Sequence, residues 1–232
     1  MIPRLSTQFK TCHHPLPPPC KGGDTPSPLQ GEGWGEVIYL YIYLCNPLKK
    51  IMDDQIFIAP DGASARIREL ADTDEDTQAA LEFINAIRAE DAMISSSGPP
   101  LLFEQERVWI QETVRECRNK EKVFLSAWDS ATLVGTSEIV RKKDRSTHVG
   151  VFGITLAKSW RGKGLGSYLM NEIMQKASYE LGITHVFLTC FAENISAQAL
   201  YKKMGFIETG RNPDMILYKG VLMDEITMMK KC

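Results

Sequence analysis

The segment SWRGKGLGSYLM, which begins at Ser159, gathers several residue types suited to phosphate binding. Three glycines at alternate positions are combined with two cations: Arg161, Gly162, Lys163, Gly164 and Gly166. Glycine lets a backbone approach a ligand closely, and the free N–H groups at the start of a helix attract anions. The cations add positive charge at the rim of such a loop. The segment therefore predicts a site for a phosphate-bearing molecule, with a plain surface turn as the alternative for this motif taken alone.

Two familiar phosphate-loop patterns do not fit the segment. The Walker pattern GxxxxGK[ST] fails because no glycine stands five positions before a Gly-Lys-Ser/Thr triplet. The dinucleotide pattern GxGxxG fails because its third glycine would fall on Ser167 or on Leu169. What remains is Arg-x-x-Gly-x-Gly, formed by Arg161, Gly164 and Gly166.

A second segment, NISAQALYKKMGF from Asn194 to Phe206, follows the next expected strand. Together the two segments resemble those of the GNAT acetyltransferase superfamily, over roughly residues 64–230. The resemblance implies acetyl-CoA as co-substrate, with its pyrophosphate held by the run Arg161, Gly162, Lys163, Gly164, Leu165 and Gly166. It also implies that Asn194 contacts the pantetheine arm, that Tyr201 is the general acid, and that no metal takes part.

The fold implied by this resemblance is α/β, in a layered α+β form. It is the GNAT fold, a mixed central sheet with splayed parallel strands, here VGVFGITLA and THVFLTCF, flanked by helices. By resemblance, backbone groups near Ile154 and Leu156 bind the pantetheine arm and the acetyl carbonyl. The chemistry agrees, because an unpaired N–H in a buried strand needs a partner. A donor of this kind aimed at a carbonyl acts as an oxyanion donor.

The implied reaction is direct attack of an amine on the thioester. Leu156 N–H would polarise the carbonyl and Tyr201 would protonate the departing sulfur, although Tyr201 could instead be a core aromatic residue. A free amine has a pKa of about 10, so a base or a water relay helps. Glu138 is the first candidate base.

Other base candidates and a departure from the family pattern also bear on this reaction. His148, Asp224 and Glu225 are alternative bases, and each candidate could equally be a solvated or structural side chain. Thr189 stands where the ribosomal-protein alanine acetyltransferases carry a glutamate, which weakens that assignment of the base.

The acceptor is expected to be a primary amine, on a small molecule or amino acid or on a protein lysine or N-terminus. The segments 91–102 and 211–225 are expected to shape its site, and their mixed character does not choose among these amines. The rival functions are a catalytically silent acyl-CoA-binding sensor or partner subunit of the same fold, and a nucleotide-binding domain.

Strands and helices alternate along the chain in an order that would position these residues. Strands are expected over Ser64–Leu70, on both sides of a hairpin turn at Asp129-Ser130, over His148–Ala157, over 184–191, near Phe206–Thr209 and over Val221–Met229. A helix is expected over 74–90, with acidic residues in its first turn, and another over 103–119. A third helix is expected from Leu165 to Leu181, ended by Gly182, and a fourth between an Asn194 cap and Gly205.

Composition narrows the class of protein. The formal net charge of −2 lacks the basic excess of a nucleic-acid-binding protein. No CxxC pair occurs, which fits a cytoplasmic protein with reduced thiols. The apolar run Val37–Cys45 is too short to span a bilayer and is poorly placed for a signal peptide, so no membrane partner is expected. A homodimer paired through the C-terminal strands is compatible with the sequence.

The first part of the chain differs from the rest. Residues 1–51 are rich in proline and glycine and are expected to be a disordered or non-native extension, with translation starting at Met52 and an acetyltransferase domain over 52–232. Cys12, His13, His14 and Cys20 could form a metal cluster, but their spacing lacks the second half of a site and favours chance ligands.

Overall fold

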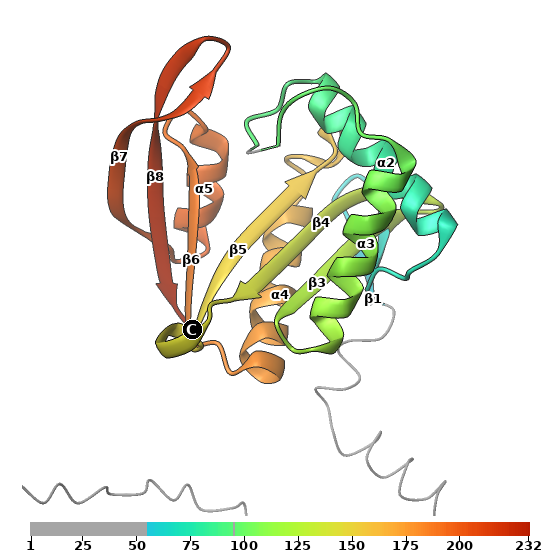
Figure 1. Ribbon diagram of the computed structural model, residues 1–232, viewed down its shortest axis with the longest axis horizontal. Helices are drawn as coiled ribbons and strands as arrows, with labels where there is room; N and C mark the ends of the chain where they lie inside the picture. Colours follow the sequence, from blue (N-terminus) through green and yellow to red (C-terminus); the bar gives the residue numbers. More distant parts are fainter. Residues whose placement is uncertain (1–54, 95) are drawn as a thin grey trace, which may run out of the picture. The chain divides into compact units, whose positions relative to one another are not determined.

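The computed structural model describes residues 55–94 and 96–232, drawn in colour in Figure 1. Three expectations lie outside these described residues: the extension over 1–51 with its start at Met52, the apolar run Val37–Cys45, and the Cys12–Cys20 cluster.

The strands of the described residues form one eight-stranded sheet, in the order β1-β2-β3-β4-β5-β6-β8-β7. In chain order they are β1 Gln55–Ile58, β2 Ser64–Arg68, β3 Lys122–Asp129, β4 Thr132–Arg141, β5 Val149–Leu156, β6 His185–Phe191, β7 Ile207–Tyr218 and β8 Val221–Lys231. β5 and β6 are parallel, whereas the other neighbouring strands are antiparallel. The predicted mixed α/β sheet is confirmed.

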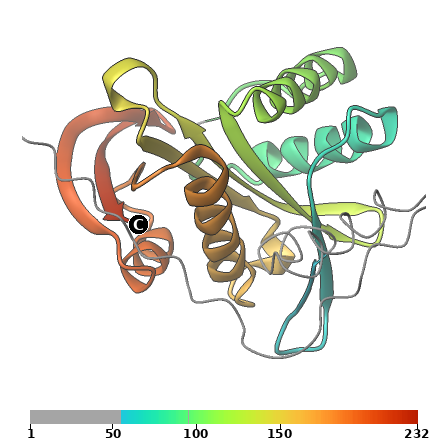
Figure 2. The ribbon, with the colours of Figure 1, turned by 90° about the horizontal axis from the view of Figure 1, so that it is seen from below.

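Helices cover both faces of this sheet. They are α2 Asp74–Ala89, α3 Phe103–Arg118, α4 Leu165–Leu181 and α5 Ile195–Lys203, with short 3-10 turns η1 Asp144–Ser146 and η2 Lys158–Trp160. Figures 1 and 2 show α2 and α3 on one face, and α4 and α5 on the other. Each face has its own apolar core, centred on Ile110 and Phe124 below α2 and α3, and on Leu169 and Ile173 below α4. None of these helices in the described part of the chain is long and apolar enough to cross a bilayer.

Local capping sets the predicted helix boundaries. Thr73 accepts a hydrogen bond from Asp76 N–H at the start of α2, and Asn194 accepts one from Ala197 N–H at the start of α5. Gly182 closes α4 in the left-handed conformation, as the sequence predicts. These residues satisfy helix-end groups that would otherwise lack partners.

The sequence expectations were wrong at three strands. β1 was not predicted, although it pairs with β2 from Gln55↔Ile67 to Ile58↔Ser64. β2 ends at Arg68 instead of Leu70. β7 continues well past the expected Thr209, because register shifts in its pairing with β8 accommodate the turn-like residues Asn212 to Asp214 within one long strand.

The parallel strands splay apart, as predicted. Their pairing extends only from Val149↔His185 to Val151↔Phe187, although β5 continues to Leu156. β6 instead pairs with β8 along its whole length, and Figure 1 shows the widening gap between β5 and β6. The rings of Tyr201 and Phe206 pack against Phe152 just beyond the last β5–β6 pair. The C-terminal half of β5 is therefore left without a strand neighbour on one side.

Candidate active site

The glycine loop lies between the end of β5 and the start of α4. Gly164 is the N-cap of α4 and has φ 89, a left-handed conformation that favours glycine. Among the described residues, no acceptor receives the N–H groups of residues 162–166. Together with the positive end of the helix, these donors form an anion-binding cradle.

The first turn of α4 packs closely on the end of β5. A Cβ at Gly166 would lie 3.2 Å from Leu200 Cδ2 and 3.3 Å from Leu156 Cδ1. Leu165 is fully buried in the core below α4. This packing brings the cradle and the splayed strand together.

The two cations of the loop are both engaged by acids. Lys163 forms an ion pair of 2.8 Å with Asp61, which follows β1. Arg161 turns toward β5, where Nε and Nη2 donate to the carbonyl oxygen of Leu156 at 3.0 and 2.9 Å. Arg161 Nη2 also contacts the Glu90 carboxylate at the C-terminal end of α2. The guanidinium therefore contacts the strand end instead of standing open at the rim.

The backbone of β5 presents alternate residues to the gap. Ala157 N–H donates to Val134 O at 2.9 Å, on the β4 side. Because backbone groups alternate along an extended strand, those of Ile154 and Leu156 face the opposite side, toward the gap. The Leu156 carbonyl oxygen on this side already accepts from Arg161. The role of the Ile154 and Leu156 backbone in binding a ligand stays a prediction.

Asn194 and Tyr201 lie on the α5 side of the gap. The Asn194 side-chain oxygen accepts from Ala197 N–H and Ser196 Oγ, while its amide nitrogen has no partner among the described residues. Asn194 is thus a helix cap whose remaining donor is free to meet a ligand.

The Tyr201 ring is buried, with edge-on contact to Phe152 at 6.2 Å between ring centroids. Among the described residues, the Tyr201 hydroxyl has no hydrogen-bond partner. Every side-chain nitrogen or oxygen that is fully enclosed in this part of the chain does have a partner. The hydroxyl oxygen must therefore reach an accessible space. Burial, and secondarily Cys190, raises the pKa of Tyr201 well above its ordinary value. Tyr201 is consequently a neutral phenol and a hydrogen-bond donor at physiological pH.

Glu138 lies on the opposite face of the sheet, below α3. It is opposite Gly153 in the β4–β5 register, and a Cβ on Gly153 would lie 3.3 Å from its Oε1. Lys122 Nζ lies 3.1 Å from Glu138 and 2.9 Å from Glu116. Burial alone would lower the pKa of Lys122, but the two carboxylates outweigh burial and raise it. Lys122 is thus a permanent cation beside Glu138.

The other candidate bases are elsewhere. The His148 ring contacts His185 at the paired end of the parallel strands, away from the splay. Asp224 pairs with Arg211 at 3.1 Å, and Glu225 accepts from Asn212 at 3.4 Å, both within the β7–β8 hairpin. Thr189 lies on β6, opposite Thr227.

The two segments expected to shape the acceptor site meet. Tyr218 Oη donates to the carbonyl oxygen of Asp91 at 2.8 Å, and Lys219 lies 3.0 Å from the Asp91 carboxylate. Segment 211–225 is a β-hairpin with its tip at these contacts, and Figure 1 shows that tip reaching toward the α2–α3 connection. The hairpin tip thus borders one end of the gap.

Sequence reasoning missed Glu106 on α3. The residue is 5% exposed, and its carboxylate has no hydrogen-bond partner among the described residues. Burial raises its pKa to about 7, against a smaller opposing effect of Arg88. Its spacing from Ile110 and Thr113, which share the buried face of α3, could have revealed it.

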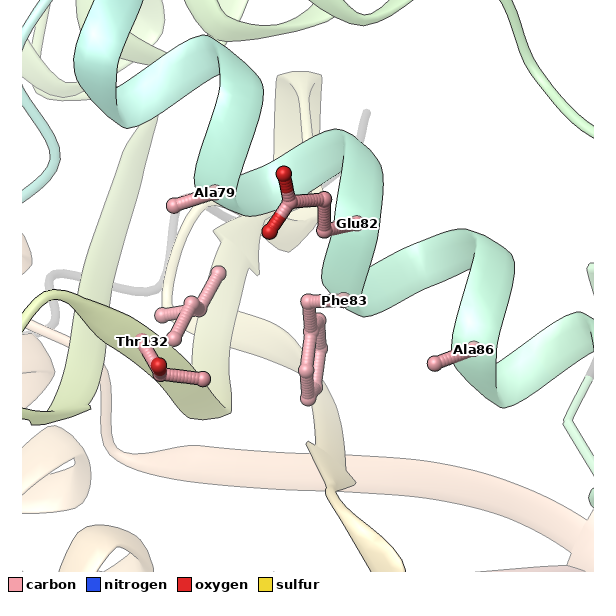
Figure 3. Close-up of a pocket in the computed structure, with 6 residues that line it drawn as sticks. Ala79, Glu82, Phe83, Ala86 and Thr132 are labelled. Carbon is pink, nitrogen blue, oxygen red and sulfur yellow. The ribbon is translucent and has the colours of Figure 1, made fainter.

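A separate pocket of about 230 Å³ lies between α2 and the start of β4. Figure 3 shows Phe83 at its wall and Glu82 at its edge. It contains none of the predicted site residues, so the candidate site remains the β5–β6 gap. Among the described residues, no group of His, Cys, Asp or Glu side chains could hold a metal ion.

Comparisons with known proteins point to one family. A family model described as "Acetyltransferase (GNAT) family" matches residues 81–206. The L-amino acid N-acetyltransferase AaaT of Escherichia coli (strain K12) is 32% identical over 91 residues, which cover 39% of this chain and 56% of that protein. The matches to curated relatives span between 32% and 66% of the relatives' own lengths.

Solved structures share the fold. A GNAT-family acetyltransferase from Streptococcus pneumoniae superposes with a TM-score of 0.63 at 24% identity, covering 71% of this chain and 97% of that one. The putative acetyltransferase yncA from Salmonella typhimurium, solved with its cofactor acetyl-CoA, gives a TM-score of 0.61 at 18% identity, covering 72% and 93%.

Proposed function

This chain belongs to the GNAT acetyltransferase family, and we propose that it transfers the acetyl group of acetyl-CoA directly to a primary amine. One observation carries the proposal: an anion cradle, an unpaired strand end and a buried phenol converge on the β5–β6 gap. The acetyl-CoA complex of yncA, which shares the fold, supports the choice of donor.

The chain's own groups suit the donor. The N–H groups of residues 162–166 would bind the pyrophosphate at the start of α4. Backbone groups of Ile154 would bind the pantetheine arm within the gap, joined by the free amide donor of Asn194, while the Leu156 N–H is left for the acetyl group. The backbone would then neutralise most of the negative charge of the pyrophosphate, because the side chains of Lys163 and Arg161 already have acidic partners.

The chemical step needs a polarised carbonyl and a proton for the leaving group. Leu156 N–H would donate to the acetyl oxygen as negative charge develops there. As the C–N bond forms and the C–S bond breaks, Tyr201 would donate its proton to the coenzyme sulfur. Its raised pKa keeps that proton in place until the thiolate appears.

The acceptor would approach from the other face of the sheet. Glu138 lies on the α3 side, over Gly153, whereas Tyr201 packs in the core below α4. Glu138 would take the proton from the incoming ammonium, directly or through water. The two proton transfers would thus occur on opposite sides of β5.

The acceptor class is a small amine or amino acid, or the lysine or N-terminus of a protein. The E. coli relative is named for L-amino acids, which makes these the first acceptors to test. The Asp91 corner and the β7–β8 hairpin would set the size of the accepted side chain.

The test is a thiol-release assay with acetyl-CoA against L-amino acids, small amines and basic peptides. Wild type should release coenzyme A with at least one acceptor. Tyr201→Phe should lower kcat on the order of 10²-fold, a typical general-acid contribution, while calorimetry shows unchanged acetyl-CoA affinity.

Tyr179→Phe is the matched control, because Tyr179 is 58% exposed on α4 and should behave as wild type. Acetyl-CoA binding without thiol release for any acceptor would favour the silent binding protein. Unchanged turnover in Tyr201→Phe would remove its role as acid.

A further inference from the structure

The proposed reaction needs the end of β5 in one conformation, yet the sheet supports it on one side only. The last β5–β6 pair is Val151↔Phe187, whereas the β4 register continues to Gly135↔Leu156. The carbonyl oxygen of Leu156 faces the gap, where no strand can pair with it.

Arg161 supplies the missing partner. Its Nε and Nη2 both donate to Leu156 O, and Nη2 also contacts Glu90, whose side chain is 20% exposed at the end of α2. We infer that Arg161 and Glu90 form a positioning pair that holds the end of β5 in the conformation that receives the donor. This inference rests on the proposed function of the gap.

The physical reason lies in the geometry of a peptide chain. Hydrogen bonds from a charged donor are stronger than neutral ones, so two of them fix the Leu156 carbonyl firmly. In an extended residue the N–H and C=O point to the same side, so fixing the carbonyl also orients the Leu156 N–H. That N–H is the group proposed to polarise the acetyl carbonyl, and such donors act only when correctly placed.

The pair also links the donor side to the acceptor side. Asp91, next to Glu90, receives Tyr218 and Lys219 from the tip of the β7–β8 hairpin. The end of α2 therefore contacts both β5, through Arg161, and the hairpin that borders the gap.

The alternative is that Arg161 binds the pyrophosphate, as the resemblance implies, and that Glu90 merely neutralises it in the free protein. The two roles predict different effects of Glu90→Ala on turnover and on coenzyme affinity. A positioning role predicts slower turnover with unchanged coenzyme affinity. A phosphate-binding role predicts tighter coenzyme binding, because the arginine loses a competing acid.

The experiment compares Arg161→Ala, Glu90→Ala and the double variant. Each single change should lower kcat between about tenfold and a hundredfold, as expected for a displaced catalytic group. The double variant should match the single ones, because both remove one device, and the Kd for coenzyme A should stay within about twofold. Glu90→Gln keeps an acceptor for Nη2 and should retain most of the wild-type kcat.

Asp61→Ala is the matched control, because it removes the acid partner of the other loop cation without touching β5. It should leave kcat unchanged. Weaker coenzyme binding in Arg161→Ala together with tighter binding in Glu90→Ala would overturn the inference. So would additive losses of kcat in the double variant.

A second readout does not depend on activity. Ala157 N–H, which donates to Val134 O at the end of β5, should exchange with solvent faster in both alanine variants and not in Asp61→Ala. If wild type releases no thiol with any acceptor, the proposed function fails, and exchange still decides whether the pair holds β5. Unchanged exchange at Ala157 in both alanine variants would overturn the pair itself.

Discussion

At the scale of single residues, surroundings give the same side chain different properties. Glu90 and Glu138 each contact a cation, Arg161 and Lys122 respectively. Glu106 is buried without a hydrogen-bond partner among the described residues, and burial raises its pKa to about 7. Burial therefore leaves Glu106 partly protonated at neutral pH.

Glu106 makes stability depend on pH. Its folded pKa of about 7 lies above the ordinary 4.5, so the folded state binds this proton more tightly. The contribution of this proton to the free energy of unfolding is fully present below about pH 4.5 and is lost as the pH rises to about 7. Glu106→Gln should therefore raise the free energy of unfolding at pH 8 by about 1–3 kcal/mol. It should also make the free energy of unfolding depend less on pH between 4.5 and 7.

Urea unfolding at pH 4.5, 6 and 8 measures this effect. The exposed Glu104, on the same helix, serves as the control through Glu104→Gln. If the free energy of unfolding of Glu106→Gln changes with pH as it does in wild type, another group causes the pH dependence.

At the scale of elements, the junction between β5 and α4 sets the site. The loop ends at Gly164, whose φ of 89 starts the helix with its N–H groups free. The close approach of Gly166 to Leu156 then fixes the distance between cradle and strand. Helix start and strand end thus act as one unit.

Gly164→Asp should abolish this unit's binding of coenzyme A while leaving the fold intact. The new carboxylate would repel the pyrophosphate and occupy its donors, each of which contributes roughly 1.5–3 kcal/mol to a charged ligand. Calorimetry should therefore show a loss of more than about tenfold in affinity.

Gly182→Asp is the control, because Gly182 has φ +65 with nothing within 4 Å and lies at the opposite end of α4. It imposes similar backbone strain away from the loop and should bind normally. Tight binding by Gly164→Asp would mean that the pyrophosphate lies elsewhere.

At the scale of the whole molecule, residues 55–232 contain both apolar cores and all the candidate site residues. The family match over 81–206 lies entirely within them. We propose that residues 52–232 form one acetyltransferase domain.

A chain beginning at Met52 should accordingly keep the wild-type kcat and a Tm within about 2 °C, since both apolar cores are formed by residues after Met52. Thermal unfolding and the thiol-release assay measure both quantities. A clear fall in either would assign residues 1–51 a part in folding or catalysis.

Short-range patterns in the sequence were sufficient to predict most elements. The Thr73 and Asn194 caps, the Gly182 stop and the glycine loop each depend on residues within a few positions of one another. The two motifs also predicted the family, which the family match confirms, and the splay of the parallel strands, which the structure confirms. Local propensity could not predict β1 or the full length of β7, because pairing partners stabilise these edge strands.

Local patterns in the chain therefore encode the glycine loop, which we propose binds the donor, and the order of the elements around it. The packing of distant segments, by contrast, sets where the loop's arginine points, because its acidic partner Glu90 lies 71 residues away at the end of α2. It likewise decided the burial of Glu106 and the contact between Asp91 and Tyr218. Caps and turns are encoded by neighbouring residues, whereas these partners come together only when distant segments pack against each other.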